Sequence, residues 1–394
     1  MFVFLFTYLI KCETYAVLIA GSRTWMNYRH QADISAIYQL LIGNGIKKEN
    51  IKQFQYDDII NNEENQFKGS IFHDLDHVNV YPGNDAIDFK GNDVTSEKLY
   101  DLLSSLKTKK DDNLLIYYDN HGGPGTLYVP NSPKDTPIYG DELNDVLQKM
   151  HDEGKYGNIL FIIEACESGS LINFMKTPNI LVLTAAGPAE ESRSAVYDPG
   201  VDNILSNEFT YNLINILKEK PSAEIGDVFA SLLKSMKGST PMIGGDDAIA
   251  KMKISDFFGL PTSNDLIKTQ RKTKRKLDLI PQRNVHYHLL KKMYEKSDPI
   301  KRSTLKTAMM NIQSETQKLV NAINKLASSL DLDTTNFPIK YNNIPTYYFD
   351  VLRHFISKYG EVQPDDMGYL ANLVHICNYK SKDDIINVIN TIFD

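Results

Sequence analysis

The sequence predicts an α/β fold in which helices cover both faces of a mostly parallel sheet, followed by a small all-α region. Between residues 15 and 260, short apolar runs of strand length alternate with runs whose apolar residues recur at helical spacing. Residues 159–163 are almost wholly apolar, which is typical of a central parallel strand. After residue 260 the apolar period is helical only. These observations define the fold class.

The elements of the first region follow one another in a βαβα order, which favours right-handed crossovers and a parallel sheet. Gly43 or Gly45 should end the first helix, and Thr95 or Ser96 should cap the second. Strands are predicted at 15–20, 51–56, 114–118, 159–163 and 180–184, and helices at 34–41, 99–106, 143–150, 209–217 and 225–236.

The second region begins after Pro261. Residues 268–276 are basic and lack an apolar period, so we interpret 261–299 as a solvated linker or activation segment, with a nucleic-acid-binding patch as the alternative. We expect residues 300–394 to form a small helical domain whose apolar stripes build a core rather than a lipid-binding surface. Its helices are predicted at 300–326, 346–358, 366–377 and 383–393.

Composition narrows the class of protein. Of 394 residues, 42% are hydrophobic and 24% charged, which supports a packed core. The net charge of −7 argues against a general nucleic-acid-binding protein. No apolar run reaches the length of a membrane-spanning helix, so we expect no transmembrane anchor. Residues 1–260 are net acidic and 261–394 net basic, so the two regions should attract each other.

The ends and the cysteines give further expectations. Residues 1–14 begin with a short apolar run, which we interpret as a signal peptide, with a buried first strand as the alternative. Cys12, Cys166 and Cys377 form neither a disulfide framework nor a zinc-binding spacing. Because no metal or cofactor motif occurs, we expect no metal and no cofactor.

His121 and Cys166 each follow the end of a predicted strand, where parallel sheets collect their ligand sites. A thiolate nucleophile needs a nearby base, and His121 could be that base. The backbone N–H groups of Gly122 and Cys166 could hold an oxyanion. Taken alone, Cys166 could equally be a small buried side chain and His121 a turn residue.

Three segments resemble one known family. Residues 164–169 (EACESG) resemble the nucleophile segment of the legumains, or asparaginyl endopeptidases. Residues 121–125 (HGGPG) resemble their histidine turn, and residues 27–33 (NYRHQAD) resemble a third family segment. The similarity covers residues 15–260. Residues 261–394 resemble, more weakly, the activation segment and prodomain of the family.

The resemblance implies a caspase-like α/β fold, a zymogen, and cleavage of protein and peptide substrates after Asn, with Asp accepted at acidic pH. A pocket with an arginine and a glutamate could satisfy both ends of a carboxamide, although the same pair could be a structural ion pair. By position, the family's roles fall on Cys166 as nucleophile, His121 as general acid and base, Asn27 as support for the histidine, and Arg29, His30, Glu164, Ser192 and Asn207 as the specificity pocket.

This chain departs from the family in three places. Asn120 stands where the family has an Asp before the histidine, and Asn207, flanked by Glu208, stands where it has an acidic pocket residue. These changes put the succinimide chemistry and the pocket charge in doubt. Cys377 has no partner for the prodomain disulfides of animal legumains.

The charge difference between the acidic first region and the basic second region predicts regulation. We expect the C-terminal prodomain to inhibit the enzyme by covering the acidic catalytic cleft, and acid to loosen it. Autocleavage is expected at Asn264, Asn284 or Asp298. The resemblance further implies a peptide ligase side reaction, cystatin-type inhibitors as partners, and an endolysosomal or secreted location in the secretory pathway.

Two other functions fit part of the sequence. The catalytic subunit of a GPI transamidase shares the His and Cys arrangement, and residues 255–259 (SDFFG) have some of its character. An inactive homologue that binds peptides or partners is the alternative from a different class. Reaction with a thiol-directed, substrate-like probe, lost on Cys166→Ser, would separate an enzyme from a binding module.

Overall fold

The computed structural model describes residues 12–130, 137–262, 277–333, 341 and 343–393. Its centre is a six-stranded sheet in the order β11-β8-β7-β3-β1-β2. Neighbouring strands run parallel except for the antiparallel pair of β11 and β8. The strands are β1 (Thr14–Ala20), β2 (Ile51–Gln55), β3 (Asn113–Asp119), β7 (Asn158–Glu164), β8 (Ile180–Thr184) and β11 (Met242–Gly245).

Successive strand residues face opposite layers of helices, as the pleat of a strand requires. Leu18 and Leu115 pack with α1, α4 and α5, whereas Val17 and Leu114 pack with α2 and α3 on the other face. The α/β expectation is therefore confirmed. The helices are α1 (Tyr28–Gly43), α2 (Ser96–Ser105), α3 (Gly140–Asp152), α4 (Glu208–Glu219), α5 (Ile225–Ser235), α6 (Asp247–Ala250) and α7 (Ser255–Phe258).

Local chemistry explains several boundaries. Thr95 is the N-cap of α2, because its hydroxyl accepts a hydrogen bond from Lys98 N at 3.1 Å. The sequence did not predict β11 or the shorter strands, whose few residues contain no usable period. These are β4 (Gly122–Gly123), β5 (Thr126–Leu127), β6 (Ile138–Tyr139), β9 (Tyr197–Asp198) and β10 (Asn203–Ile204).

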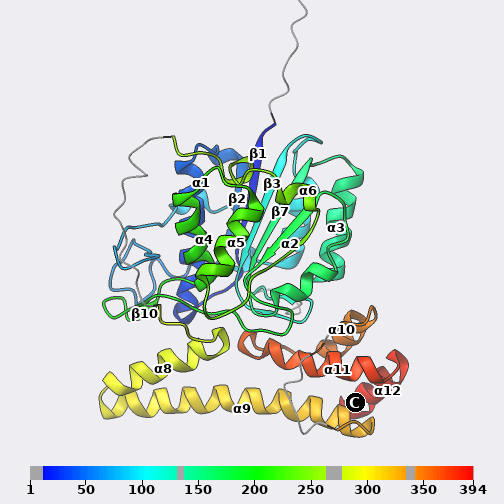
Figure 1. Ribbon diagram of the computed structural model, residues 1–394. Coiled ribbons are helices and arrows are strands. Elements are labelled where there is room, and N and C mark those ends of the chain that lie inside the picture. The colour runs from blue at the N-terminus through cyan, green and yellow to red at the C-terminus, as the bar shows by residue number, and fades with distance from the viewer. Residues whose placement is uncertain (1–11, 131–136, 263–276, 334–340, 342, 394) are drawn as a thin grey trace, which may run out of the picture.

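The C-terminal helices form a layer at one end of the α/β body (Figure 1). Tyr128 and Tyr139 of the body belong to the same apolar cluster as these helices, so the two parts pack together. α8 lies inside 261–299, the stretch expected to be a linker, of which 263–276 lies outside the described residues. The helices are α8 (Val285–Lys296), α9 (Pro299–Ser329), α10 (Tyr348–Tyr359), α11 (Ala371–Tyr379) and α12 (Lys382–Phe393).

Two 3₁₀ turns connect this layer to the body. They are η7 (Gln282–Asn284), just before α8, and η8 (Pro364–Leu370), just before α11. Within the described residues, no helix is both long and apolar enough to cross a membrane. Of the expected signal peptide, residues 1–11 lie outside the described part, and Thr14 begins β1.

Candidate active site

The ends of β3 and β7 bring His121 and Cys166 to one edge of the sheet. The two strands pair in register, with Asp119 opposite Glu164, and each candidate residue lies two positions further along. The loops touch, because a Cβ atom on Gly122 would lie only 2.6 Å from the carbonyl oxygen of Cys166. Position 122 therefore requires glycine for this close approach.

His121 is held by Asn27, which ends the 3₁₀ turn η1 (Trp25–Asn27). His121 Nε2 lies 2.9 Å from Asn27 Oδ1, and Asn27 Nδ2 donates to the carbonyl oxygen of Arg23. Since Nδ2 is the donor of this amide, Oδ1 accepts, and Nε2 of the imidazole carries the proton. Nδ1 is then the ring nitrogen with a free lone pair.

Cys166 is only 1% exposed, and its thiol has the Ser192 hydroxyl as a neighbour, with Sγ and Oγ 4.0 Å apart. No hydrogen bond joins Cys166 to His121 in the part of the chain that the structure describes. Burial raises the pKa of Cys166 to about 12, against the nearby charge of Arg283. Burial likewise lowers the pKa of His121 to about 4, against Asp365. Both groups are therefore neutral in this form of the protein.

Arg29 and Glu164 lie at the base of the expected specificity pocket, and both are fully buried. Arg29 Nη1 donates to the carbonyl oxygen of Met26 at 3.0 Å. Burial raises the pKa of Glu164 well above its usual range, and the Ser192 hydroxyl opposes this rise. Neither Glu164 oxygen has a hydrogen-bond partner of normal geometry, and no ion pair joins it to Arg29 among the described residues.

His30 and Asn207 form the other side of the pocket and are also fully buried. His30 Nδ1 lies 2.7 Å from Asp119 Oδ1, and Asn207 Nδ2 donates to the same oxygen at 2.9 Å. The backbone N–H of Asn207 donates to Asp33 Oδ2 at 2.9 Å. All five residues expected in the pocket thus lie close to one another at the end of the sheet.

Gln282, a residue that the sequence analysis missed, fills this pocket from η7. Arg29 Nε donates to Gln282 Oε1 at 2.7 Å, and Gln282 Nε2 donates to Asn207 Oδ1. The side chain is 1% exposed. Its carboxamide, the group that the pocket was expected to bind, is the only signal in the sequence that could have identified it.

Two further side chains from the C-terminal region lie against the candidate dyad. Arg283 Nη2 is 2.7 Å from Glu167 Oε2, directly after Cys166. Asp365 Oδ1, from η8, is 3.7 Å from His121 Nδ1. A Cβ on Gly368 would lie 1.9 Å from Arg283 Cζ, so η8 packs directly on the guanidinium. The dyad is covered by η7 and η8 together.

The comparison with known proteins decides the family. A family model described as Peptidase C13 matches residues 14–262. This chain belongs to the peptidase C13 family. The family has the caspase-like fold, which agrees with the parallel sheet and its flanking helices. The curated relatives that the chain resembles include proteins named legumain and vacuolar-processing enzyme.

The relatives extend the similarity beyond the C13 segment. A vacuolar-processing enzyme of Glycine max is 34% identical over 336 residues, covering 77% of this chain and 66% of the relative. A hemoglobinase of Schistosoma japonicum is 29% identical over 388 residues, covering 92% of this chain and 88% of the relative. A legumain of Canavalia ensiformis is 33% identical over 316 residues, covering 72% and 66%. The first and third matches span just under two thirds of those relatives.

Of the expected cleavage positions, Asn264 lies outside the described residues. Asn284 is exposed and ends η7, two residues after Gln282. Asp298 is exposed and caps α9, its carboxylate accepting from the N–H groups of Ile300 and Lys301. A cut at Asp298 would require the start of α9 to unfold locally.

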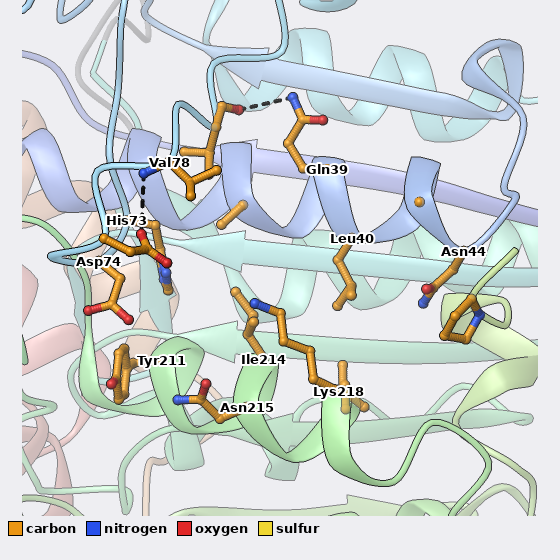
Figure 2. Close-up of a pocket in the computed structure, with 16 residues that line it drawn as sticks. Gln39, Leu40, Asn44, His73, Asp74, Val78, Tyr211, Ile214, Asn215 and Lys218 are labelled. Carbon is orange, nitrogen blue, oxygen red and sulfur yellow. Dashed lines mark hydrogen bonds between the residues drawn. The ribbon is translucent and has the colours of Figure 1, made fainter. Parts of the chain in front are cut away.

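A cavity of about 240 Å³ lies elsewhere, between α1, α4 and the loop at 73–80 (Figure 2). Its lining includes His73, whose Nε2 is 2.8 Å from Asp33 Oδ1, but neither Cys166 nor His121. Asp33 in turn accepts from Asn207 N, so Asp33 lies between this cavity and the expected specificity pocket.

Proposed function

We propose that the protein cleaves peptide bonds after asparagine through an acyl-enzyme on Cys166. The observation that carries this proposal is the Gln282 carboxamide between Arg29 and Asn207. Arg29 is a donor only, and Asn207 Oδ1 is an acceptor, so the pair satisfies both ends of a carboxamide. An asparagine side chain offers the same two groups.

In the proposed reaction, His121 Nδ1 takes the thiol proton of Cys166 as Sγ bonds to the carbonyl carbon. The N–H groups of Gly122 and Cys166 hold the oxyanion, and the proton passes to the leaving amine as the C–N bond breaks. Water then attacks the thioester, releasing the acid and restoring the thiol. An amine in place of water would ligate two peptides.

The same proposal gives the C-terminal region the role of inhibitor. Gln282 occupies the pocket, and Arg283 pairs with the residue after the nucleophile. Asp365 lies beside His121 Nδ1, the nitrogen that must take the thiol proton of Cys166. Substrate cannot enter until these groups leave. Release is proposed to follow acidification and autocleavage at Asn264, Asn284 or Asp298.

Two features of the proposal concern location and partners. Relatives named vacuolar-processing enzyme support an acidic compartment of the secretory pathway, endolysosomal or vacuolar, reached through the expected signal peptide at 1–14. Protein substrates follow from the peptidase family. Cystatin-type proteins are proposed as inhibitors of the uncovered site.

The specificity is tested with the acid-activated protein and four peptides that differ only in Asn, Asp, Gln or Lys at the cut. We expect Asn to be cleaved fastest, and Cys166→Ala to abolish cleavage while leaving the folded protein intact. Equal cleavage of the Gln or Lys peptide would overturn the Asn proposal, whereas cleavage by Cys166→Ala would overturn the assignment of the nucleophile.

A further inference from the structure

Asp119, the last residue of β3, supplies a carboxylate to the specificity pocket. It is fully buried, and its Oδ1 accepts from Asn207 Nδ2 at 2.9 Å and lies 2.7 Å from His30 Nδ1. Its Oδ2 accepts from the Thr210 hydroxyl at 3.0 Å. Position 207, before α4, is an amide in this chain, where the family resemblance implies an acidic residue, so Asp119 at the end of β3 brings the acid from a different element.

The hydrogen bonds across the pocket run in one direction. Arg29 can only donate, and it donates to the Gln282 carbonyl oxygen. Gln282 donates to Asn207 Oδ1, and Asn207 donates through Nδ2 to Asp119 Oδ1. Arg29 at one end can only donate, and Asp119 Oδ1 at the other end accepts. Together they fix the orientation of the side-chain amides of Gln282 and Asn207.

Resting on the proposed function, we propose that Asp119 is a positioning residue that makes the pocket select a carboxamide over a carboxylate. Because Asp119 holds the Nδ2 end of Asn207, a ligand meets Asn207 Oδ1. The NH₂ group of a substrate asparagine donates to this oxygen. An aspartate in the same place would set a carboxylate oxygen against it, leaving buried acceptors unpaired.

The alternative orientation of Asn207 is blocked by the same residue. Turning its amide over would place Oδ1 against Asp119 Oδ1, so an acceptor would face an acceptor. Asp33 and Glu164 are the other carboxyl groups near Asp119, and burial and Asp33 raise the pKa of Asp119 well above its usual range. A protonated Asp119 still has one bare oxygen, and the hydrogen bond that Oδ1 accepts from Asn207 Nδ2 favours that oxygen as the bare one.

The test compares the preference for Asn over Asp, as a ratio of kcat/KM, in full-length protein activated at one acidic pH. Asp119→Ser removes the fixed acceptor, because a hydroxyl or a water can donate as well as accept. We expect the preference to fall about tenfold or more, mainly through faster cleavage after Asp. Asp119→Asn can keep a carbonyl oxygen at the same place and should hold the ratio within about threefold of the unmodified protein.

A double variant, Asp119→Ser with Asn207→Asp, returns a fixed acceptor to the pocket with no change in net charge. It should recover the Asn preference that Asp119→Ser loses. If Asp119→Ser does not fold, the double variant decides alone, and recovered Asn selectivity supports the assignment. A double variant that fails to fold or lacks the preference overturns it, as does an unchanged ratio in Asp119→Ser.

These outcomes are distinct from failure of the proposed function. If the unmodified, activated protein does not prefer Asn at all, the proposed specificity is wrong. If it prefers Asn and Asp119→Ser keeps that preference, only the role of Asp119 is wrong. Equal losses in the cleavage rates after Asn and after Asp would indicate a purely structural role and would also reject the assignment.

Discussion

Arg283 Nη2 lies 2.7 Å from Glu167 Oε2, so an ion pair joins the C-terminal region to the residue that follows Cys166. The two side chains are 16% and 5% exposed. Removing one partner of an ion pair this shielded from water is costly, because the charge of the other partner stays buried. Arg283 also lies 3.5 Å from Glu191 through Nη1, so one guanidinium serves two carboxylates.

Replacing this guanidinium should loosen the covered form. We expect Arg283→Gln to start self-cleavage at a higher pH than the unmodified chain and about tenfold faster at a given pH, because Glu167 loses its partner. Intact mass followed across a pH series measures this. Lys52→Gln is the matched control, since it breaks a surface pair with Asp88 far from η7 and should change nothing. Equal behaviour of the two variants would contradict the account.

Gln282 should act as a pocket ligand when supplied separately. A synthetic peptide of residues 277–296 with Asn284→Ala, so that the enzyme cannot cut it at that proposed site, is expected to inhibit the activated enzyme competitively. The Gln282→Leu peptide should bind about fivefold to a hundredfold more weakly, because Arg29 and Asn207 would be left without partners. Inhibition constants for the two peptides provide the comparison, and equal constants would show that Gln282 is not in the pocket.

The reactivity of Cys166 should report the covered state. In full-length protein at neutral pH, a thiol reagent should modify Cys166 slowly, because the thiol is 1% exposed and burial raises its pKa to about 12. Peptide mapping after acid activation should then show fast labelling of Cys166. Fast labelling before activation would contradict the covered geometry.

The pH at which the covered site opens depends on whether the covered or the open form binds more protons. Burial lowers the pKa of His121 from 6.5 to about 4 in the covered form, so opening takes up a proton between those values and acid favours opening. Burial would raise the pKa of Asp365, but His286 and His121 bring it below its usual value, which acts in the same direction. Burial raises the pKa of Asp366 to about 6, and this group opposes opening as the pH falls.

Asp366→Asn separates these contributions. Its amide oxygen can still accept from the Thr316 hydroxyl, which lies 2.7 Å from Asp366 Oδ1, so the fold should be kept. The amide is neutral, like the protonated carboxyl that the covered form favours, so it should stabilise the covered form wherever Asp366 would ionise on opening. The midpoint pH of self-cleavage should therefore fall by about half a unit to one unit. A midpoint that stays in place or rises would show that other groups govern the opening.

Four of the five predicted parallel strands contain a continuous apolar run buried on both faces, as Ile180–Thr184 is throughout, whereas Ile51–Gln55 mixes apolar and polar residues. The sequence did not predict α8, because α8 has an apolar face of only a few residues, such as Val285 and Leu289. Strands of two residues, such as Gly122–Gly123, carry no period at all. Their pairing is decided by contacts that only the folded chain provides.

The candidate site divides in a similar way. His121 and Cys166 could be proposed because both follow apolar strands and lie in distinctive segments. Gln282 and Asp119 could not, since each acts through contacts with residues that are distant in the chain. Gln282 is 253 positions from Arg29, and Asp119 is 88 positions from Asn207. A motif comparison at position 207, the N-cap of α4, cannot reveal a carboxylate that comes from the end of β3.

The most direct test of the central claim shifts full-length protein from about pH 7 to about pH 4.5 and records intact mass and Asn-peptide cleavage together. The account predicts that Asn-selective turnover appears as the mass falls by loss of the C-terminal region, with neither change in Cys166→Ala. A chain that stays uncut and inactive throughout, or that cleaves Asn peptides fully at neutral pH while intact, would contradict it.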